Sequence, residues 1–347
     1  MDDDVRLLRG LVTIPSPTGS TDKAVRFLVE EMRQRGFEAE VDGAGNAIGT
    51  IGRGAREILL VGHVDTVPGD LPVRLDGGVL WGRGSVDAKG PLAAFVAAAS
   101  RFARDERVRV TVVGCLDEEA ESEGAKHLLT THPRPEALVI GEPSGTDGVT
   151  IGYKGIVKIR YVVEEDLAHT GAPFPSVPDR GIAFWTAIQA YLAPLHGASL
   201  FDTPTVKLSS FDTRLLPSGR HRVELVGSAR IPPGFDAAAF CAFLRERQGT
   251  GAVTVAEVDP AWVSDKNAAV ARAFVASVRA TGLVPRYVKK TGTSDMNILA
   301  PKWDVPCVAY GPGDASLDHT PHERLALDDY ARAIRVLEGA IRRLADG

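Results

Sequence analysis

Five histidine and acidic side chains stand where apolar runs of the sequence give way to turns. They lie in the segments GHVDTVPG, GRGSVDAKG, LDEEAESEGA, GEPSG and DHTPHE and are His63, Asp87, Glu119, Glu142 and His319. Imidazole and carboxylate ligands without cysteine are typical of a hydrolytic zinc site, not of a structural one. Five ligands exceed the need of one catalytic zinc, but they suit two ions that share a bridging carboxylate. The sequence therefore predicts a hydrolytic centre with two metals.

The tripeptide HVD adds a residue, Asp65, behind the first histidine. Side chains along a strand alternate in direction, so at a strand end His63 and Asp65 point the same way. Asp65 can then accept a hydrogen bond from the second ring nitrogen of His63 and fix its tautomer. A surface histidine beside an ordinary aspartate is the alternative, and HVD alone does not separate the two.

An acidic run, Asp117 to Glu119, follows an apolar run that ends at Cys115. Adjacent carboxylates repel one another, so a strand end is a poor place for them unless a cation is near. Neighbouring side chains point in different directions. Glu119 can therefore bind metal while Glu118 acts as general base. Cys115, inside the apolar run, is expected in the core.

The other candidates have ordinary explanations when each is taken alone. Asp87 could be the N-cap of a following helix, Glu142 a helix-start carboxylate and His319 a surface histidine. We favour the metal centre because the ordinary explanation needs a separate coincidence at every strand end. Two rival sites are excluded: GRGSVDAKG lacks the residue order of a phosphate loop, and Ser85 lacks the context of a nucleophile elbow.

The elements that position these residues are predicted to form an α/β domain. Apolar runs at 57–61, 108–115 and 137–140 predict strands buried on both faces, with helical patterns at 20–36, 91–102 and 125–131. Alternating strands and helices indicate a layered α/β domain, whose sites form beyond the carboxyl ends of the strands. Every candidate ligand before residue 150 is expected there.

The pattern changes near residue 153. Between 156 and 258 the composition predicts strand, helix, strand, strand, helix and strand, the order of a ferredoxin-like α+β module. A strand at 305–310 and a helix at 327–345 resume the α/β pattern seen before residue 153. We therefore expect a catalytic domain of residues 1–154 and 264–347, interrupted by an inserted domain of residues 155–263.

Composition excludes several functions. The net charge of −5 argues against nucleic acid as a partner. No run approaches 18 apolar residues and the N-terminus has no signal-peptide pattern, so we expect no membrane span. Three cysteines without paired spacing fit a reducing compartment. A cytoplasmic protein is expected.

In type and order these segments resemble those of the dizinc exopeptidase and deacylase family that includes acetylornithine deacetylase, succinyl-diaminopimelate desuccinylase and the aminoacylases. The resemblance covers nearly the whole chain. It implies a zinc-exopeptidase-like catalytic domain with an inserted dimerisation domain. It also implies that His63 and Glu142 bind one zinc, that Glu119 and His319 bind a second, and that Asp87 bridges them.

The resemblance implies roles for five further residues. Asp65 supports the first histidine, and Glu118 is the general base. His169, in the segment AHTGAP, stabilises the oxyanion in the active site of the other subunit of a homodimer. Arg230, in ARIPPG, holds a substrate carboxylate, and Asp295, in TGTSDMN, belongs to a loop on the substrate side.

The segment GEPSGTDGVTIGYKG is similar to the branch that removes the N-acyl group from lysine or ornithine, including hydrolases that release lysine from a small acidic amino-group carrier protein. This implies an amidohydrolase of lysine or arginine biosynthesis with two Zn²⁺ per subunit, or Co²⁺ in their place. A carrier substrate predicts a basic rim, with the candidates Lys154, Lys158, Arg160, Lys289 and Lys290. The alternatives are acetylornithine deacetylase, succinyl-diaminopimelate desuccinylase, a dizinc dipeptidase or carboxypeptidase, a single-zinc enzyme and a non-catalytic metal-binding protein.

Overall fold

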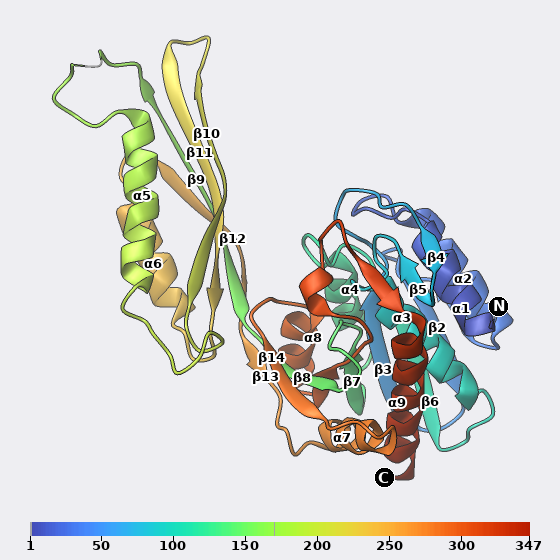
Figure 1. Ribbon diagram of the computed structural model, residues 1–347. Helices are drawn as coiled ribbons and strands as arrows, with labels where there is room; N and C mark the ends of the chain where they lie inside the picture. Colours follow the sequence, from blue (N-terminus) through green and yellow to red (C-terminus); the bar gives the residue numbers. More distant parts are fainter. Residues whose placement is uncertain (1, 170) are drawn as a thin grey trace. The chain divides into compact units, whose positions relative to one another are not determined.

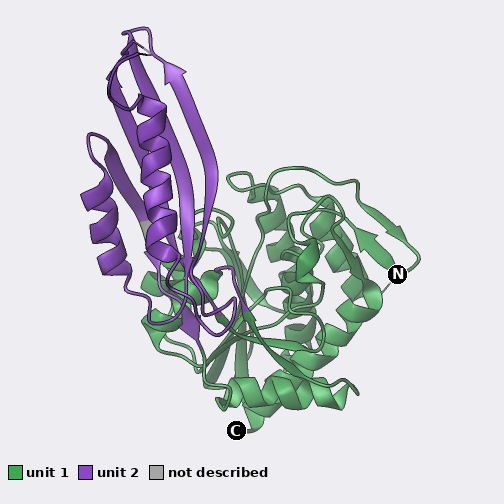
Figure 2. Ribbon diagram, turned by 60° about the vertical axis from the view of Figure 1, so that its left-hand side comes forward, with its two compact units in different colours: residues 1–152, 264–289, 294–347 green, residues 153–263, 290–293 purple. Residues whose placement is uncertain are grey.

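The computed structural model describes residues 2–169 and 171–347, with Glu257 described by its backbone alone. The chain divides into two compact units, which Figure 2 shows in separate colours. Unit 1 contains the residues up to 152 together with 264–289 and 294–347, and unit 2 contains 153–263 and 290–293. The expected insertion, residues 155–263, lies within unit 2, which also includes residues 153, 154 and 290–293.

A mixed sheet with the order β1-β2-β6-β3-β7-β15-β8 forms the centre of unit 1 (Figure 1). Its parallel strands are β3 (Arg56–His63), β6 (Val108–Cys115), β7 (Ala137–Ile140) and β15 (Cys307–Ala309). The antiparallel strands at its two sides are β1 (Glu38–Val41), β2 (Ala47–Gly52) and β8 (Gly148–Tyr153), and β14 (Arg286–Lys290) pairs with β8. Every residue of β3 after Arg56 is buried, as expected of a strand covered on both faces.

Helices cover this sheet (Figure 1). They are α1 (Asp3–Thr13), α2 (Asp22–Gln34), α3 (Lys89–Ala99), α4 (Glu123–Thr131), α7 (Ala269–Ala280), α8 (Asp295–Trp303) and α9 (Leu327–Asp346). α3 packs against α1, α9 and β3, and all of its residues are buried. Its run of alanines allows this, because small side chains let neighbouring elements approach from every side.

The parallel strands bring their carboxyl ends to one edge of the sheet. β3 ends at His63, β6 leads into the acidic run and β7 leads into Glu142. A small sheet of order β16-β5-β4 supplies the other two loops. Its strands are β4 (Arg74–Asp76), β5 (Val79–Trp81) and β16 (Arg324–Ala326). β5 precedes the Asp87 loop, and β16 follows the His319 loop.

Unit 2 is an α+β module. Its elements are β9 (Gly155–Asp166), α5 (Val177–Leu192), β10 (Thr205–Leu215), β11 (Arg220–Ile231), α6 (Ala237–Arg247), β12 (Ala252–Asp259) and the short β13 (Trp262–Val263). The antiparallel sheet has the order β10-β11-β9-β12, which is the ferredoxin-like arrangement expected from the sequence. Ile159, Leu225, Phe184 and Phe240 are among the residues of its core.

Several elements of unit 1 are absent from the sequence prediction. β4, β5 and β16 have three residues each, too few for a periodic pattern. α8 contains Pro301 and begins at a capping box of Ser294 and Asn297 that the sequence analysis missed. Thr21 is the N-cap residue of α2, but its side chain makes no capping hydrogen bond. Within the described part of the chain, no helix combines the length and apolarity needed to cross a bilayer.

Candidate metal centre

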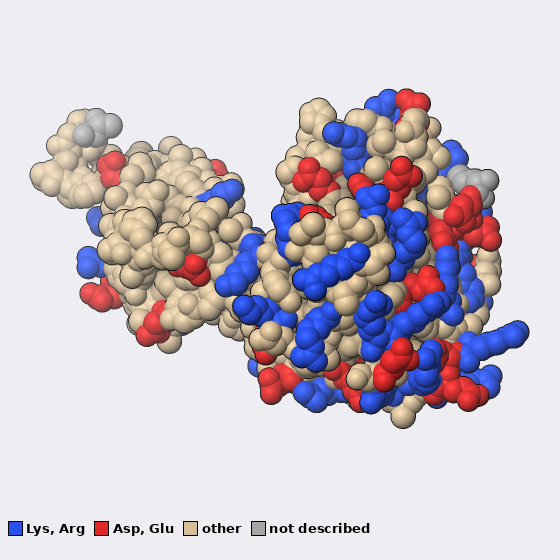
Figure 3. Space-filling model, turned by 60° about the horizontal axis from the view of Figure 1, so that its bottom comes forward, with Lys and Arg blue, Asp and Glu red and all other residues tan. Residues whose placement is uncertain are grey.

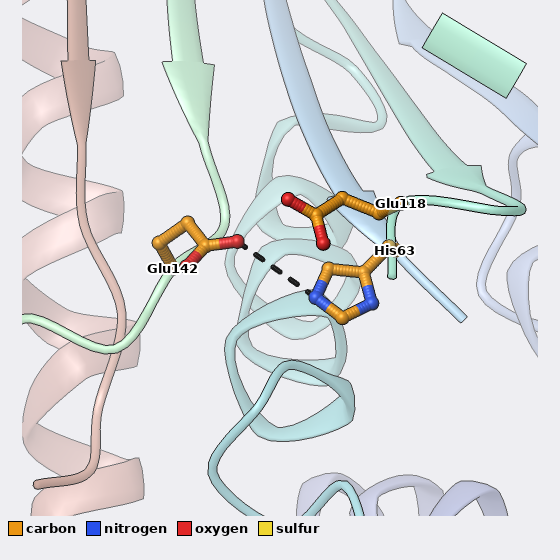
Figure 4. A group of neighbouring side chains, drawn as sticks. All are labelled: His63, Glu118 and Glu142. Atoms are coloured by element: carbon orange, nitrogen blue, oxygen red, sulfur yellow. Dashed lines mark ion pairs between the residues drawn. The ribbon is translucent and has the colours of Figure 1, made fainter. Parts of the chain in front are cut away.

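His63 is the last residue of β3 and is 1% exposed. Its Nδ1 lies 2.9 Å from the main-chain carbonyl oxygen of Asp65. A carbonyl oxygen only accepts, so Nδ1 carries a proton and Nε2 is the nitrogen directed at a metal. Nε2 lies 3.3 Å from Oδ1 of Asp87 and 3.7 Å from Oε1 of Glu142. Figure 4 shows His63, Glu118 and Glu142 converging from the ends of three strands.

His319 makes the second group of contacts. Its Nε2 lies 3.0 Å from Oδ2 of Asp87 and 3.0 Å from Oε1 of Glu119. The two oxygens of Asp87 therefore face different histidines, Oδ1 toward His63 and Oδ2 toward His319. This is the arrangement required of a carboxylate that bridges two ions.

The spacing of these atoms suits metal ligation. Two ligands bound to one tetrahedral ion at about 2.0–2.1 Å lie about 3.3 Å apart. The nitrogen-to-oxygen distances of 3.0–3.7 Å bracket this value. One group of donor atoms, from His63, Glu118 and Glu142, lies within 4.8 Å of one another, and a second, from His63, Asp87 and Glu119, does so too. The donor set of imidazole nitrogen and carboxylate oxygen thus fits divalent ions such as zinc.

The electrostatics of the cluster favour a cation. Burial opposes a charge on His63, yet the nearby carboxylates of Asp65 and Asp87 raise its pKa well above 6.5. Bonds to Asp87 and then Glu119 raise the pKa of His319 to about 10. The imidazoles hold positive charge strongly because carboxylates surround them. A metal ion can supply the same charge once these protons leave.

Glu118 occupies a different environment from its neighbour Glu119. Its side chain lies beside His63 and Glu142 (Figure 4). Burial, and then the negative charges of Glu142 and Asp295, raise the pKa of Glu118 well above 4.5, against the lowering effect of His63. A carboxyl group with a raised pKa binds a proton more readily near neutral pH, which is the property of a general base that must later act as an acid.

Asp65 is fully buried and contacts more than His63. Its carboxylate accepts hydrogen bonds from the backbone N–H groups of Glu118 at 3.2 Å and Glu119 at 3.3 Å, and from the Thr18 hydroxyl at 2.8 Å. Its Oδ1 is 3.6 Å from Nδ1 of His63, farther than the Asp65 carbonyl oxygen. The carboxylate expected to orient the histidine therefore also holds the acidic loop in place.

A buried ion pair that the sequence analysis missed supports the Asp87 loop. Glu323 is 1% exposed, and its Oε1 accepts from the backbone N–H groups of Val86 at 2.9 Å and Asp87 at 3.1 Å. Its Oε2 accepts from Nη1 of Arg83 at 2.8 Å. Arg83 also donates to the carbonyl oxygens of Gly69 and Thr320. One ion pair thus links three loops. The glutamate at the end of HTPHE was a usable signal, because a short strand with the buried Leu325 follows it.

The remaining predicted site residues are His169, Arg230 and Asp295. His169 is exposed in unit 2 after β9, and its Nδ1 accepts from the N–H of Gly171 at 3.1 Å; the next residue of AHTGAP, Thr170, lies outside the described residues. Arg230 lies on β11 of unit 2 and donates to the hydroxyl of Thr293. Asp295 opens α8 in unit 1 and is 2% exposed. Their roles stay predictions.

Lys154 was wrongly predicted to belong to a basic rim. It is fully buried in unit 2, and its Nζ donates to the carbonyl oxygen of Thr203. A buried ammonium group bonded to its own chain cannot form part of an exposed surface. Of the other candidates, Arg160 and Lys289 are exposed, whereas Lys158 and Lys290 are half-buried.

The sequence matches one protein-family model and is similar to relatives named as hydrolases. The sequence model of peptidase family M20/M25/M40 matches residues 59–343. A relative from Thermococcus kodakarensis named putative LysW-lysine/LysW-ornithine hydrolase is 43% identical over 99% of this chain and 92% of its own length. A relative from Deinococcus radiodurans named LysW-lysine hydrolase is 41% identical over 98% of this chain and 97% of its own.

Solved structures share the fold. The metallo-carboxypeptidase Sso-CP2 of Sulfolobus solfataricus superimposes with a TM-score of 0.83 at 19% identity, over the whole of both chains. Human carnosine dipeptidase 1 gives a TM-score of 0.81 at 15% identity, over 100% of this chain and 96% of its own. At these identities the likeness concerns the fold alone.

Proposed function

The chain belongs to peptidase family M20/M25/M40 and is a hydrolase of linear amide bonds, and we propose that it releases lysine, and also ornithine, from a carrier-protein conjugate. The observation that carries this proposal is the identity of 43% and 41%, over almost the whole chain, with relatives named for LysW conjugates. We take LysW to be the amino-group carrier predicted from GEPSGTDGVTIGYKG. The alternative deacetylase, desuccinylase and dipeptidase activities are not favoured by these relatives.

We propose two zinc ions per subunit, with cobalt as an alternative metal. His63 and Glu142 would hold one ion, Glu119 and His319 the other, and Asp87 would bridge them. The support for a pair is that each oxygen of Asp87 faces a different histidine. Two divalent ions bound there would lower the pKa of a water molecule to about 7 and polarise the amide carbonyl.

Glu118 would act first as general base and then as general acid. Its carboxylate accepts a proton from the water that adds to the amide carbon, and later gives that proton to the nitrogen that leaves. The C–N bond breaks as the amine is protonated. The products are a carboxyl group on the carrier, which loses its remaining proton to solvent at neutral pH, and a free amino acid. The partly buried position of Glu118 raises its pKa, which supports both steps.

The other assignments rest on the family resemblance. We propose that unit 2 forms the contacts of a homodimer and that His169 stabilises the oxyanion in the opposite subunit. Arg230 would hold the carboxylate of the substrate, and Asp295 would lie on the substrate side of the site. Cytoplasmic biosynthesis of lysine or arginine is the setting that fits such a reaction.

A substrate panel tests this proposal. The zinc-loaded enzyme is offered N-acylated lysine, ornithine and diaminopimelate, both free and linked to the carrier, and the released amino acid is quantified. We expect the lysine conjugate of the carrier to give the highest kcat/KM, followed by the ornithine conjugate. Faster turnover of free acetylornithine, succinyl-diaminopimelate or simple dipeptides would replace the proposal with the corresponding alternative.

A further inference from the structure

An aromatic and two basic side chains lie in one row across the small sheet of unit 1. In the strand register Trp81 on β5 is opposite Arg74 on β4 and opposite Arg324 on β16. The adjacent residues Leu80 and Leu325 are each 1% exposed and face the core. Because successive residues of a strand point to opposite faces, the row of Arg74, Trp81 and Arg324 lies on the outer face.

The two guanidinium groups flank the indole ring. The Cζ atom of Arg74 lies 4.3 Å from the ring centroid of Trp81, and that of Arg324 lies 4.8 Å from it. Such contacts are favourable cation–π interactions, and they do not neutralise the guanidinium charges. Asp314 interacts with Arg324 only over a longer range. Arg324 donates to the carbonyl oxygen of His322. Among the residues that the structure describes, neither guanidinium has a carboxylate within ion-pair distance.

The row stands next to the ligand loops in the sequence. Trp81 directly precedes the loop 82–88, which carries Asp87, and Arg324 directly follows the loop 318–323, which carries His319. The strands β5 and β16 are paired, so both loops leave the same end of the small sheet region. A partner bound to the row would therefore contact the strands from which two of the ligand loops extend.

We propose that Arg74, Trp81 and Arg324 form a docking surface for the acidic carrier protein that presents the acylated lysine, an inference that rests on the proposed function. Carboxylates of the carrier would pair with the two guanidinium groups, which suit two-point hydrogen bonding. The indole would supply a flat apolar contact, and tryptophan and arginine are the side chains that most often dominate protein interfaces. The chain carries a net charge of −5, so an acidic partner needs a local basic surface such as this row in order to bind.

The test compares charge-reversal variants at matched positions. Arg74→Glu, Arg324→Glu and the double variant are assayed on lysine-loaded LysW and on a small N-acyl-lysine. Arg104→Glu is the control, because basic side chains gather elsewhere on unit 1 as well (Figure 3) and Arg104 is exposed at the opposite end of β6 from the acidic run. The double variant Arg74→Lys, Arg324→Lys keeps the charge.

We expect the ratio of kcat/KM for the conjugate to kcat/KM for the small substrate to fall about tenfold in the double Glu variant, and the loss to shrink in high salt. The Lys variant should restore most of the ratio, and Arg104→Glu should leave it at the wild-type value. An unchanged ratio in the double Glu variant overturns the docking surface. An equal loss on both substrates also overturns it, because the change then acts on folding or chemistry.

Binding of LysW without turnover separates the two proposals. Calorimetry at low salt should detect the carrier on the wild-type enzyme and weaker binding on the double Glu variant. If the wild-type enzyme binds LysW but does not hydrolyse the conjugate, and the double Glu variant binds LysW more weakly, the proposed function is refuted and the docking surface is kept. If the wild-type enzyme hydrolyses the conjugate and both proteins bind LysW equally well, the proposed function is kept and the docking surface is overturned. Equal competition by duplex DNA would show a general polyanion site and overturn the inference.

Discussion

The ion pair of Glu323 and Arg83 gives a prediction that separates support of the metal site from metal ligation. The change Glu323→Gln keeps the size of the side chain and removes its charge. The amide oxygen can still accept from the backbone N–H groups of Val86 and Asp87, which lie 2.9 and 3.1 Å from Oε1. The amide nitrogen must then face Nη1 of Arg83, where Oε2 now accepts at 2.8 Å. Two donors would meet in a buried position.

The folding free energy that Glu323→Gln loses follows from these contacts. The variant loses a charge-assisted bond to Arg83 and weakens two others to backbone N–H groups, while Arg83 keeps its bonds to Gly69 and Thr320. Breaking a buried ion pair at one partner costs about 3–5 kcal/mol, and the remaining bonds of Arg83 place the loss at about 3 kcal/mol. Because Asp87 and His319 are in the loops that the pair links, we also expect metal affinity to fall about 10- to 100-fold.

Two measurements check this. Urea unfolding of the metal-free variant gives the loss of folding free energy, and competition with a chromophoric chelator gives the affinity for Zn²⁺. The matched control is Glu121→Gln, the same change on an exposed residue of the acidic loop. A Glu323→Gln protein that binds zinc as tightly as the control would refute the reasoning, even if its unfolding free energy were lower.

Three other outcomes are expected. Glu118→Gln should lower kcat/KM roughly 100-fold or more with metal content unchanged, measured by steady-state kinetics and elemental analysis; near-normal turnover would remove Glu118 from the reaction. Burial alone would raise the pKa of Glu57, but the imidazole of His132 at 3.3 Å and a hydrogen bond from the Thr111 hydroxyl lower it from 4.5 to about 2. This carboxylate therefore stabilises the fold above pH 4.5 by about 3 kcal/mol, and the contribution is lost as the pH falls toward 2. Urea unfolding between pH 6 and 3 should show a smaller acid loss in Glu57→Gln, and parallel profiles would contradict the assignment. Removal of metal by a chelator should abolish activity and lower the unfolding temperature, and both should return with Zn²⁺ or Co²⁺; activity that survives chelation would exclude a metal-dependent reaction.

The strands of unit 1 that carry ligands were predictable because burial on both faces leaves a continuous apolar run. β6 and β7 have the predicted bounds, and Cys115 is fully buried as expected. β8 was missed, since Gly148–Tyr153 follows a loop rich in glycine and is short in aliphatic residues. Continuous apolar runs therefore identified the central strands, whereas elements defined by caps or by pairing with distant segments required the structure.

The contacts that shape the site depend on backbone geometry that no residue pattern contains. His319 has a positive φ of 62° and Asp117 a φ of 68°, conformations uncommon for residues other than glycine. Neither glycine nor asparagine marks these positions, so the turns were not foreseen. Residue types at strand ends predicted which side chains converge, but not how the loops hold them.

Asp65 shows why the first histidine and the acidic loop must be considered together. The sequence assigned its carboxylate to the imidazole, yet in the structure the imidazole donates to the Asp65 carbonyl, while the carboxylate accepts from the N–H groups of Glu118 and Glu119. Removing the carboxylate would leave two buried N–H groups without an acceptor and release both glutamates at once. An aspartate placed behind a metal ligand is then also a determinant of the general base, so the loss of activity on its mutation cannot be assigned to His63 alone.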